Sequence, residues 1–179
     1  ANYVNAYAFP GGSIAATRGI LISLNNEAEL AGLLGHELGH VNARHTAASM
    51  SRGAVLGMAL GGIGAITGQS DGQGGFGDIL QQVGQLGGQV LLASYSRDNE
   101  RQADALGMQY MVKANYSADG MVGLMDLLRS MHRQSPSALE LMFATHPMSD
   151  ERYSTVMSTA NTQYLYAANF PLNRERYMD

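Results

Sequence analysis

The chain has 179 residues, a net charge of -4 and a hydrophobic share of 45%. These values fit a folded protein with a sizeable core and argue against disorder throughout, so we treat residues 1–179 as a single domain. Lys113 is the one lysine and no basic cluster is present, which gives no support to nucleic-acid binding. Cysteine is absent, which excludes disulfides, thiolate metal ligands and a cysteine nucleophile.

The first elements are expected to be short antiparallel strands. Residues 3–9 alternate loosely between apolar and polar side chains, residues 10–13 have turn composition, and residues 14–17 and 20–24 are apolar enough for further strand. Asn26 can then cap a helix, with Glu29 three residues later completing a capping box. That helix is predicted to run over about residues 27–50.

This first long helix contains the motif His36-Glu37-Leu38-Gly39-His40. Residues four apart on a helix share one face, so His36 and His40 can bind a single ion while Glu37 projects beside them. A solvated surface helix is the alternative, but the apolar residues around the motif oppose it. A catalytic zinc takes three protein ligands and a water, so the chain must supply one more ligand.

Glycine is concentrated between residues 53 and 88, which hold thirteen of the chain's 22 glycines. The apolar stretch that begins this segment, residues 53–67, is shorter than the ~20 residues that a membrane-spanning helix needs. We interpret the segment as an insertion, either a loop or a helical hairpin, that covers and gates the active site. A glycine-rich pair of closely packed helices is an equally good interpretation.

The third metal ligand is expected on a second helix, which Ser96 caps and which extends to about residue 113. Glu100 on this helix can supply the oxygen of a His₂Glu zinc site, and Asp104, one turn later, can accept the free ring N–H of His36. A solvated salt-bridge face is the alternative interpretation of this helix. His45 is the other candidate ligand, but a continuous helix would turn it roughly 140° away from His40, so we interpret it as a hydrogen-bonded structural histidine.

The rest of the sequence predicts three more helices. One begins near Ser117 and has an apolar stripe that should pack in the core, a short one covers about residues 136–144, and the last covers about residues 150–160.

Several segments, in this order along the chain, resemble the gluzincin zinc metallopeptidases of the CAAX prenyl endopeptidase and HtpX family. The similarity is greatest to the soluble bacterial envelope branch, the BepA-like and LoiP-like peptidases. The segments that carry it are Asn5-Ala6-Tyr7-Ala8-Phe9-Pro10-Gly11-Gly12, residues 36–45, residues 100–104, and Thr145-His146-Pro147 with Arg152.

The resemblance implies an α+β, mostly α-helical fold in which a small N-terminal antiparallel sheet packs on the zinc helix and the second ligand helix. It implies one zinc per chain with Glu100 as third ligand and Asp104 as its partner. His146 would lie near the metal, either stabilising the oxyanion or capping the zinc in a resting state. Arg152 would line the same cleft, and Asn5 and Ala6 would belong to an edge strand that binds extended substrate.

The sequence therefore predicts a zinc endopeptidase in which Glu37 acts as the general base. Its expected substrates are misfolded or misassembled envelope proteins bound as extended strands, and the envelope membrane or its assembly machinery is a further candidate partner. A latent, zinc-stabilised binding or chaperone-like assembly module with a plugged site is the alternative. No targeting signal is visible, so either the protein is cytoplasmic or its signal was removed. The resemblance to the envelope branch implies the second, a periplasmic or outer-membrane-associated bacterial protein, and a cytoplasmic location is the alternative.

Overall fold

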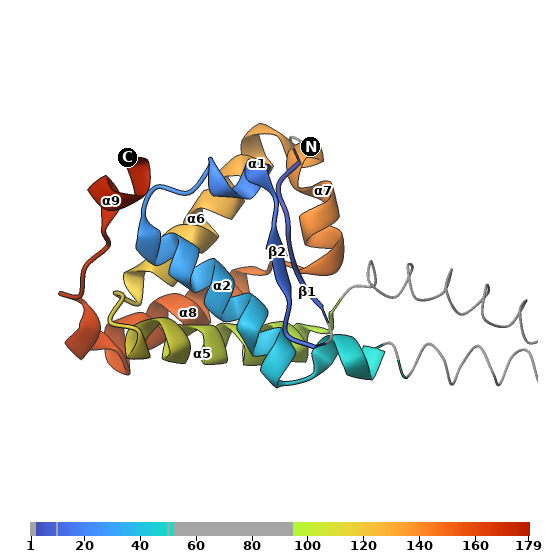
Figure 1. The fold of residues 1–179 in the computed structure, drawn as a ribbon, viewed down its shortest axis with the longest axis horizontal. Coiled ribbons are helices and arrows are strands. Elements are labelled where there is room, and N and C mark those ends of the chain that lie inside the picture. The colour runs from blue at the N-terminus through green and yellow to red at the C-terminus, as the bar shows by residue number, and fades with distance from the viewer. Residues whose placement is uncertain (1–2, 10, 50, 52–94) are drawn as a thin grey trace, which may run out of the picture.

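A computed structural model of the protein describes residues 3–9, 11–49, 51 and 95–179 (Figure 1). The part it describes is mostly helical, with one small antiparallel sheet, as the sequence predicted. The glycine-rich insertion predicted over residues 53–88 lies outside the described residues.

The sheet consists of β1 (Ala6–Ala8) and β2 (Ile14–Ala16), which pair antiparallel. The third strand expected over residues 20–24 is wrong, because a short helix, α1 (Arg18–Leu21), takes its place. The Thr17 hydroxyl accepts a hydrogen bond from the Ile20 N–H and caps this helix. The helical turn directs Ile20 into the core, where its side chain is fully buried.

Helix α2 (Glu27–Asn42) begins as predicted and ends earlier than predicted. Asn26 caps it by accepting a hydrogen bond from the Glu29 N–H at 2.9 Å. The expected continuation to about residue 50 is wrong, because Arg44 adopts a left-handed backbone conformation with φ 58°. That conformation cannot continue a right-handed helix, and a separate helical stretch starts at His45.

Helix α5 (Arg97–Lys113) crosses α2 at backbone contact (Figure 1). Ser96 caps α5 as predicted, by accepting a hydrogen bond from the Asn99 N–H. A Cβ added to Gly35 would lie 2.8 Å from the Gly107 carbonyl oxygen, and one added to Gly39 would lie 2.9 Å from Ala103 backbone atoms. Small residues on both helices therefore permit a close approach of the two backbones. This approach brings together the side chains that lie next to the small residues on α2 and α5.

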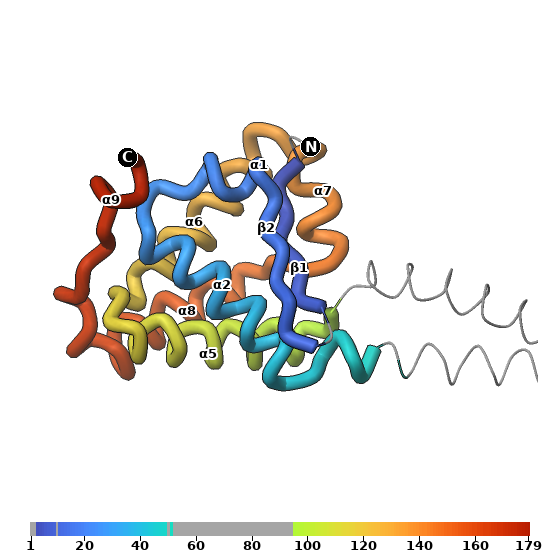
Figure 2. The backbone as a smooth tube through the Cα atoms, in the orientation of Figure 1, coloured from blue at the N-terminus to red at the C-terminus, as the bar shows by residue number. Residues whose placement is uncertain are grey.

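The remaining helices complete the core around α6 (Asp119–Gln134), which packs against α2, α7 (Pro136–Thr145) and α8 (Asp150–Thr162). The predicted apolar stripe of α6 is buried there. The tube in Figure 2 shows α7, α8 and α9 following α6 in the chain. After α8 come two short elements that the sequence did not predict, the 3-10 turn η1 (Leu165–Ala167) and α9 (Arg174–Met178).

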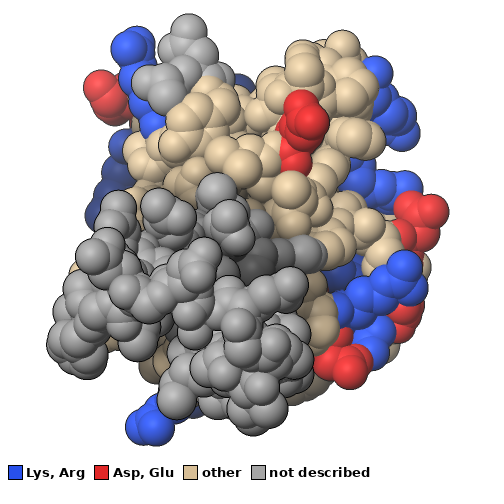
Figure 3. Space-filling view, turned by 90° about the vertical axis from the view of Figure 1, so that its right-hand side faces the viewer, with Lys and Arg blue, Asp and Glu red and all other residues tan. Residues whose placement is uncertain are grey.

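The surface carries charges of both signs. On the face shown in Figure 3, basic and acidic side chains are interspersed along one edge of the described surface, and uncharged residues cover most of its upper part. Among the helices of the described residues, none combines the length and apolar composition needed to cross a bilayer.

Candidate metal centre

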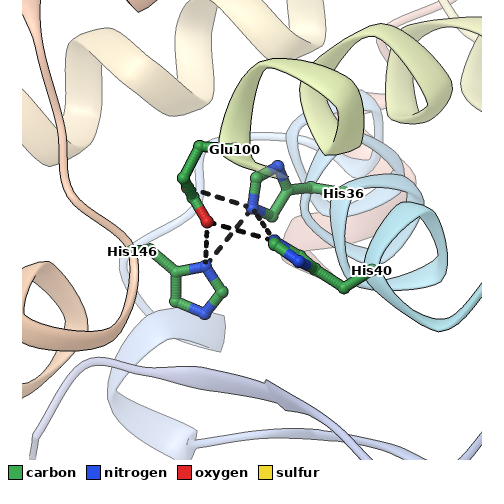
Figure 4. Close-up of side chains that lie close together, drawn as sticks. All are labelled: His36, His40, Glu100 and His146. Atoms are coloured by element: carbon green, nitrogen blue, oxygen red, sulfur yellow. Dashed lines mark hydrogen bonds and ion pairs between the residues drawn. The ribbon is translucent and has the colours of Figure 1, made fainter. Parts of the chain in front are cut away.

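Four buried side chains from three parts of the fold converge on one point (Figure 4). His36 and His40 come from α2, Glu100 comes from the first turn of α5, and His146 follows the last residue of α7. One nitrogen or oxygen atom from each lies within 4.8 Å of all the others. The His40 Nε2 atom, for example, is 3.0 Å from His36 Nε2 and 3.1 Å from Glu100 Oε1. This set of imidazole and carboxylate donors could hold a divalent metal ion.

Asp104 and Arg152 form a buried layer behind this cluster. Asp104 Oδ1 accepts a hydrogen bond of 2.9 Å from the Nδ1–H of His36, which leaves His36 Nε2 facing the other three donors. Arg152 donates two hydrogen bonds of 2.7 Å to the Asp104 carboxylate and also pairs with Glu100 Oε2 at 2.6 Å. Arg152 is thus held against two acidic groups, in addition to lining a cavity beside His36 and His146.

The carboxylates of Glu100 and Asp104 have pKa values below their usual range despite their burial. Burial alone would raise the pKa of Glu100, but the imidazoles of His36, His146 and His40 outweigh it and hold that pKa well below its usual range. Burial likewise opposes ionisation of Asp104, and hydrogen bonds from His36 and Arg152 reverse the effect and lower the Asp104 pKa. Burial lowers the pKa of His40 to about 3, so His40 is neutral, as a metal ligand must be.

Asp104→Asn is expected to lower the free energy of unfolding by about 1.5–3 kcal/mol at pH 7, because asparagine lacks the negative charge that pairs with Arg152 and keeps only one of the two acceptor oxygens. The Asp104 pKa is lowered by folding, so the unfolded chain binds the proton more readily. The stability that this carboxylate contributes is therefore present above about pH 4 and lost on further acidification. Urea unfolding in EDTA from pH 7 to pH 3 should show the difference in free energy of unfolding between the parent chain and Asp104→Asn becoming smaller. A difference that stays constant would contradict the expectation.

Glu37 lies beside the cluster without belonging to it. Its side chain is fully buried, and neither carboxylate oxygen has a hydrogen-bond partner in the described part of the chain. Its one ion-pair contact in that part is with His146, whose Nε2 atom is 3.7 Å from Glu37 Oε1. A buried carboxylate without partners is costly unless a solvent molecule or a ligand satisfies it. This unpaired group therefore fits a site that binds a metal ion together with a water molecule.

Two residues that sequence reasoning missed connect the cluster to the sheet. The ring of Tyr95 stacks on the ring of His40, with centroids 3.9 Å apart. The Tyr95 hydroxyl is 2.7 Å from the Thr46 hydroxyl, which donates a hydrogen bond to the carbonyl oxygen of Ala8 in β1. No motif signals these contacts, because they depend on how distant segments pack.

The outer edge of β1 has no strand paired with it among the described residues. The carbonyl oxygen of Asn5 and the N–H of Phe9 form hydrogen bonds with the β2 side of the sheet. Because backbone groups alternate in direction along a strand, the N–H and carbonyl groups of Ala6 and Ala8 point to the other edge. The Ala6 N–H donates to the Asn5 side chain at 2.9 Å, and Asn5 Nδ2 is buried with no partner in the described part of the chain. Asn5 and Ala6 are fully buried, so the edge that the sequence assigned to substrate is unpaired but not exposed.

Two hollows flank the cluster. An apolar cavity of about 30 Å³, enough for one small group, lies next to His36 and His146 and is lined mainly by side chains of α6 and α7. A larger groove of about 350 Å³ reaches His40 from the other side, between the β1–β2 turn and Thr46.

Comparison with known proteins identifies the family. The sequence profile described as peptidase family M48 matches residues 1–160, which is most of the chain. The chain belongs to peptidase family M48. The resemblance inferred from the sequence motifs is therefore confirmed at the level of the family.

Named relatives of this M48 chain include bacterial proteases. It is 33% identical over 149 residues to metalloprotease YcaL of Escherichia coli K12, a match that covers 83% of the chain and 55% of YcaL. It is 32% identical over 155 residues to the putative beta-barrel assembly-enhancing protease of Vibrio cholerae, covering 83% of the chain and 31% of that protein. A protease HtpX homolog of Desulfatibacillum aliphaticivorans is 32% identical over 158 residues, covering 82% of the chain and 51% of the relative. The M48 chain thus spans about a third to just over half of the length of these relatives.

Proposed function

We propose that this M48 chain is a zinc-dependent endopeptidase and that residues 1–179 form one catalytic domain. The observation that carries the proposal is the buried cluster of four donors, with the carboxylate of Glu37 beside it accepting no hydrogen bond in the described part of the chain. In this proposal His36, His40 and Glu100 are the zinc ligands, and Asp104 orients His36 through its Nδ1–H. Arg152 offsets the negative charge of Glu100 and Asp104, and lines the cleft on the side of the apolar cavity.

When bound, zinc would polarise the scissile carbonyl and lower the pKa of the attacking water towards ~7. Glu37 accepts the proton of that water and passes it to the leaving amine. Its burial and its freedom from hydrogen bonds support this role, because no competing partner in the described part of the chain holds the carboxylate.

The substrates we propose are unfolded or misassembled proteins bound as extended strands. The outer edge of β1, which has no strand paired with it among the described residues, supports this, because added strands are held mainly by backbone hydrogen bonds that depend little on sequence. Asn5 and Ala6 are buried, so the edge must be uncovered before a chain can bind there. In this arrangement the Asn5 side chain leaves the Ala6 N–H and donates from Nδ2 to the bound chain. The name of the Vibrio cholerae relative, a beta-barrel assembly-enhancing protease, supports a role in envelope quality control. We therefore propose a location in the periplasm or at the outer membrane, near the assembly machinery.

Metal removal tests the proposed function. The purified chain is expected to cleave fluorescently labelled unfolded casein, to lose that activity in EDTA, and to recover it when the EDTA is removed and one equivalent of zinc is added. Cleavage that persists after the metal is removed would contradict the proposal. If the zinc-loaded chain binds casein without cleaving it, the latent binding or assembly module becomes the better conclusion.

His146 is proposed to cap the zinc in a resting state. Its Nδ1 atom is 3.1 Å from Glu100 Oε1 and 3.4 Å from His36 Nε2, inside the donor set, which supports capping over the alternative of oxyanion stabilisation. His146→Ala should then raise the rate of casein hydrolysis, by about tenfold if the capped arrangement holds nine molecules in ten. A fall of about 10²–10³ in kcat would instead assign His146 to the oxyanion.

A further inference from the structure

His45 is the one histidine near the cluster that contributes no donor to it. The chain turns after α2 at the left-handed Arg44, and the His45 side chain that follows lies against His40. His45 is buried, and its Nδ1 atom lies 3.0 Å from the Nδ1 atom of His40. It therefore meets the nitrogen of His40 that faces away from the donor set.

Gln102 on α5 determines which way the hydrogen bonds run. The Gln102 Oε1 atom lies 3.1 Å from His45 Nε2, and an amide oxygen can only accept, so His45 Nε2 carries the hydrogen. The Nδ1 atom of His45 is then an acceptor, and it can take a hydrogen bond from the Nδ1–H of His40 at 3.0 Å. The Glu100 carboxylate, 3.1 Å from His40 Nε2, competes for the same proton in the metal-free chain. When His40 donates from Nδ1, its Nε2 atom keeps its lone pair among the other ligand atoms.

The two histidines of α2 are thus held in the same tautomer by different means. His36 donates to Asp104, a carboxylate paired with Arg152, whereas His40 donates to an imidazole that is held by an amide. A carboxylate partner orients a ring and makes it more basic. A neutral partner orients the ring and selects its tautomer without adding charge.

We infer that His45 and Gln102 are positioning residues that prepare His40 to bind metal through Nε2. Gln102 sets the orientation of His45, and His45 fixes His40 as the Nδ1–H tautomer. The inference rests on the proposed function only in naming zinc as the metal. The tautomer of His40 can be measured in the metal-free chain.

Three variants of the full chain test the inference by zinc affinity, measured in competition with a chromogenic chelator. His45→Phe keeps a ring but removes both hydrogen bonds, and should weaken zinc binding about 10–100-fold. Gln102→Met, at an exposed position, should also weaken zinc binding. Gln102→Glu retains an acceptor for His45 and should restore affinity at least to that of the parent chain. His132→Phe, which replaces an exposed histidine outside the cluster, should leave affinity unchanged.

Nitrogen NMR of the histidine rings in EDTA provides a readout that loss of packing alone would not change. The parent chain should show His40 protonated at Nδ1, and Gln102→Met should show a mixture of the two tautomers. Wild-type affinity in both His45→Phe and Gln102→Met, or a parent His40 protonated at Nε2, would overturn the inference. If the chain bound no zinc, the proposed function would fail, and the NMR result would still decide whether the hydrogen-bonded relay exists.

Discussion

Glu37→Gln is expected to slow the cleavage of unfolded casein by about 10²–10⁴-fold while leaving zinc affinity close to that of the parent chain. The factor is that of a lost general base, because glutamine has the shape of glutamate but cannot accept a proton at neutral pH. Zinc affinity should persist because Glu37 is not among the four converging donors. The measurement is the rate of casein hydrolysis at saturating zinc, together with zinc content by elemental analysis.

Glu27→Gln is the matched control, since it makes the same chemical change in the first turn of the same helix. Glu27 forms an ion pair at 3.2 Å with Arg176, whose side chain is mostly exposed, so its replacement should leave hydrolysis unchanged. Equal cleavage by the parent and Glu37→Gln chains would remove Glu37 from the reaction and end the peptidase proposal in its present form. Absence of cleavage by both would favour a closed site that needs a trigger.

Local patterns in the sequence predict the individual parts of this site well. The spacing of His36 and His40 places them on one face of α2, and the spacing of Glu100 and Asp104 does the same on α5, because both follow from helical periodicity alone. The caps at Asn26 and Ser96 follow from short-range hydrogen bonding. Each of these predictions needs only a few neighbouring residues.

The relative placement of the two helices is harder to predict, because it depends on their closest approach. The signal for it is in the sequence: Gly35 and Gly39 are four apart on α2, and Ala103 and Gly107 are four apart on α5. These small residues define the faces that meet at backbone contact. Their matched spacing is the one sequence feature that indicates where the helices cross, and it does so only when the two segments are considered as a pair.

The end of α2 differs from the prediction for another reason. No glycine or proline marks the break, and the left-handed residue is Arg44, a conformation that costs an arginine energy. The packing that follows offsets this cost, since the turn brings His45 to His40 and Thr46 to Ala8. Long-range contacts of this kind override local propensity, so local propensity could not reveal the break.

Arg152→Met should lower the free energy of unfolding of the metal-free chain by about 3–5 kcal/mol, the usual effect of removing one partner from a buried ion pair. Arg152 is buried and is held by Glu100, Asp104 and the carbonyl oxygen of Pro147. Methionine roughly matches the length of the stem but leaves two buried carboxylates without their cation. Chemical unfolding in EDTA, followed by circular dichroism at pH 7, measures the loss.

Arg129→Met is the control for this effect, because it removes an arginine from a partly exposed ion pair with Asp150. Exposed pairs contribute only about 0–1 kcal/mol, so the two variants should differ clearly. Zinc should recover part of the loss in Arg152→Met, because a divalent ion next to Glu100 replaces the missing positive charge and binding stabilises only the folded chain. An Arg152→Met chain as stable as the parent in EDTA would mean that the buried carboxylates do not depend on this guanidinium. An equal loss with and without saturating zinc would mean that the ion does not bind beside Glu100.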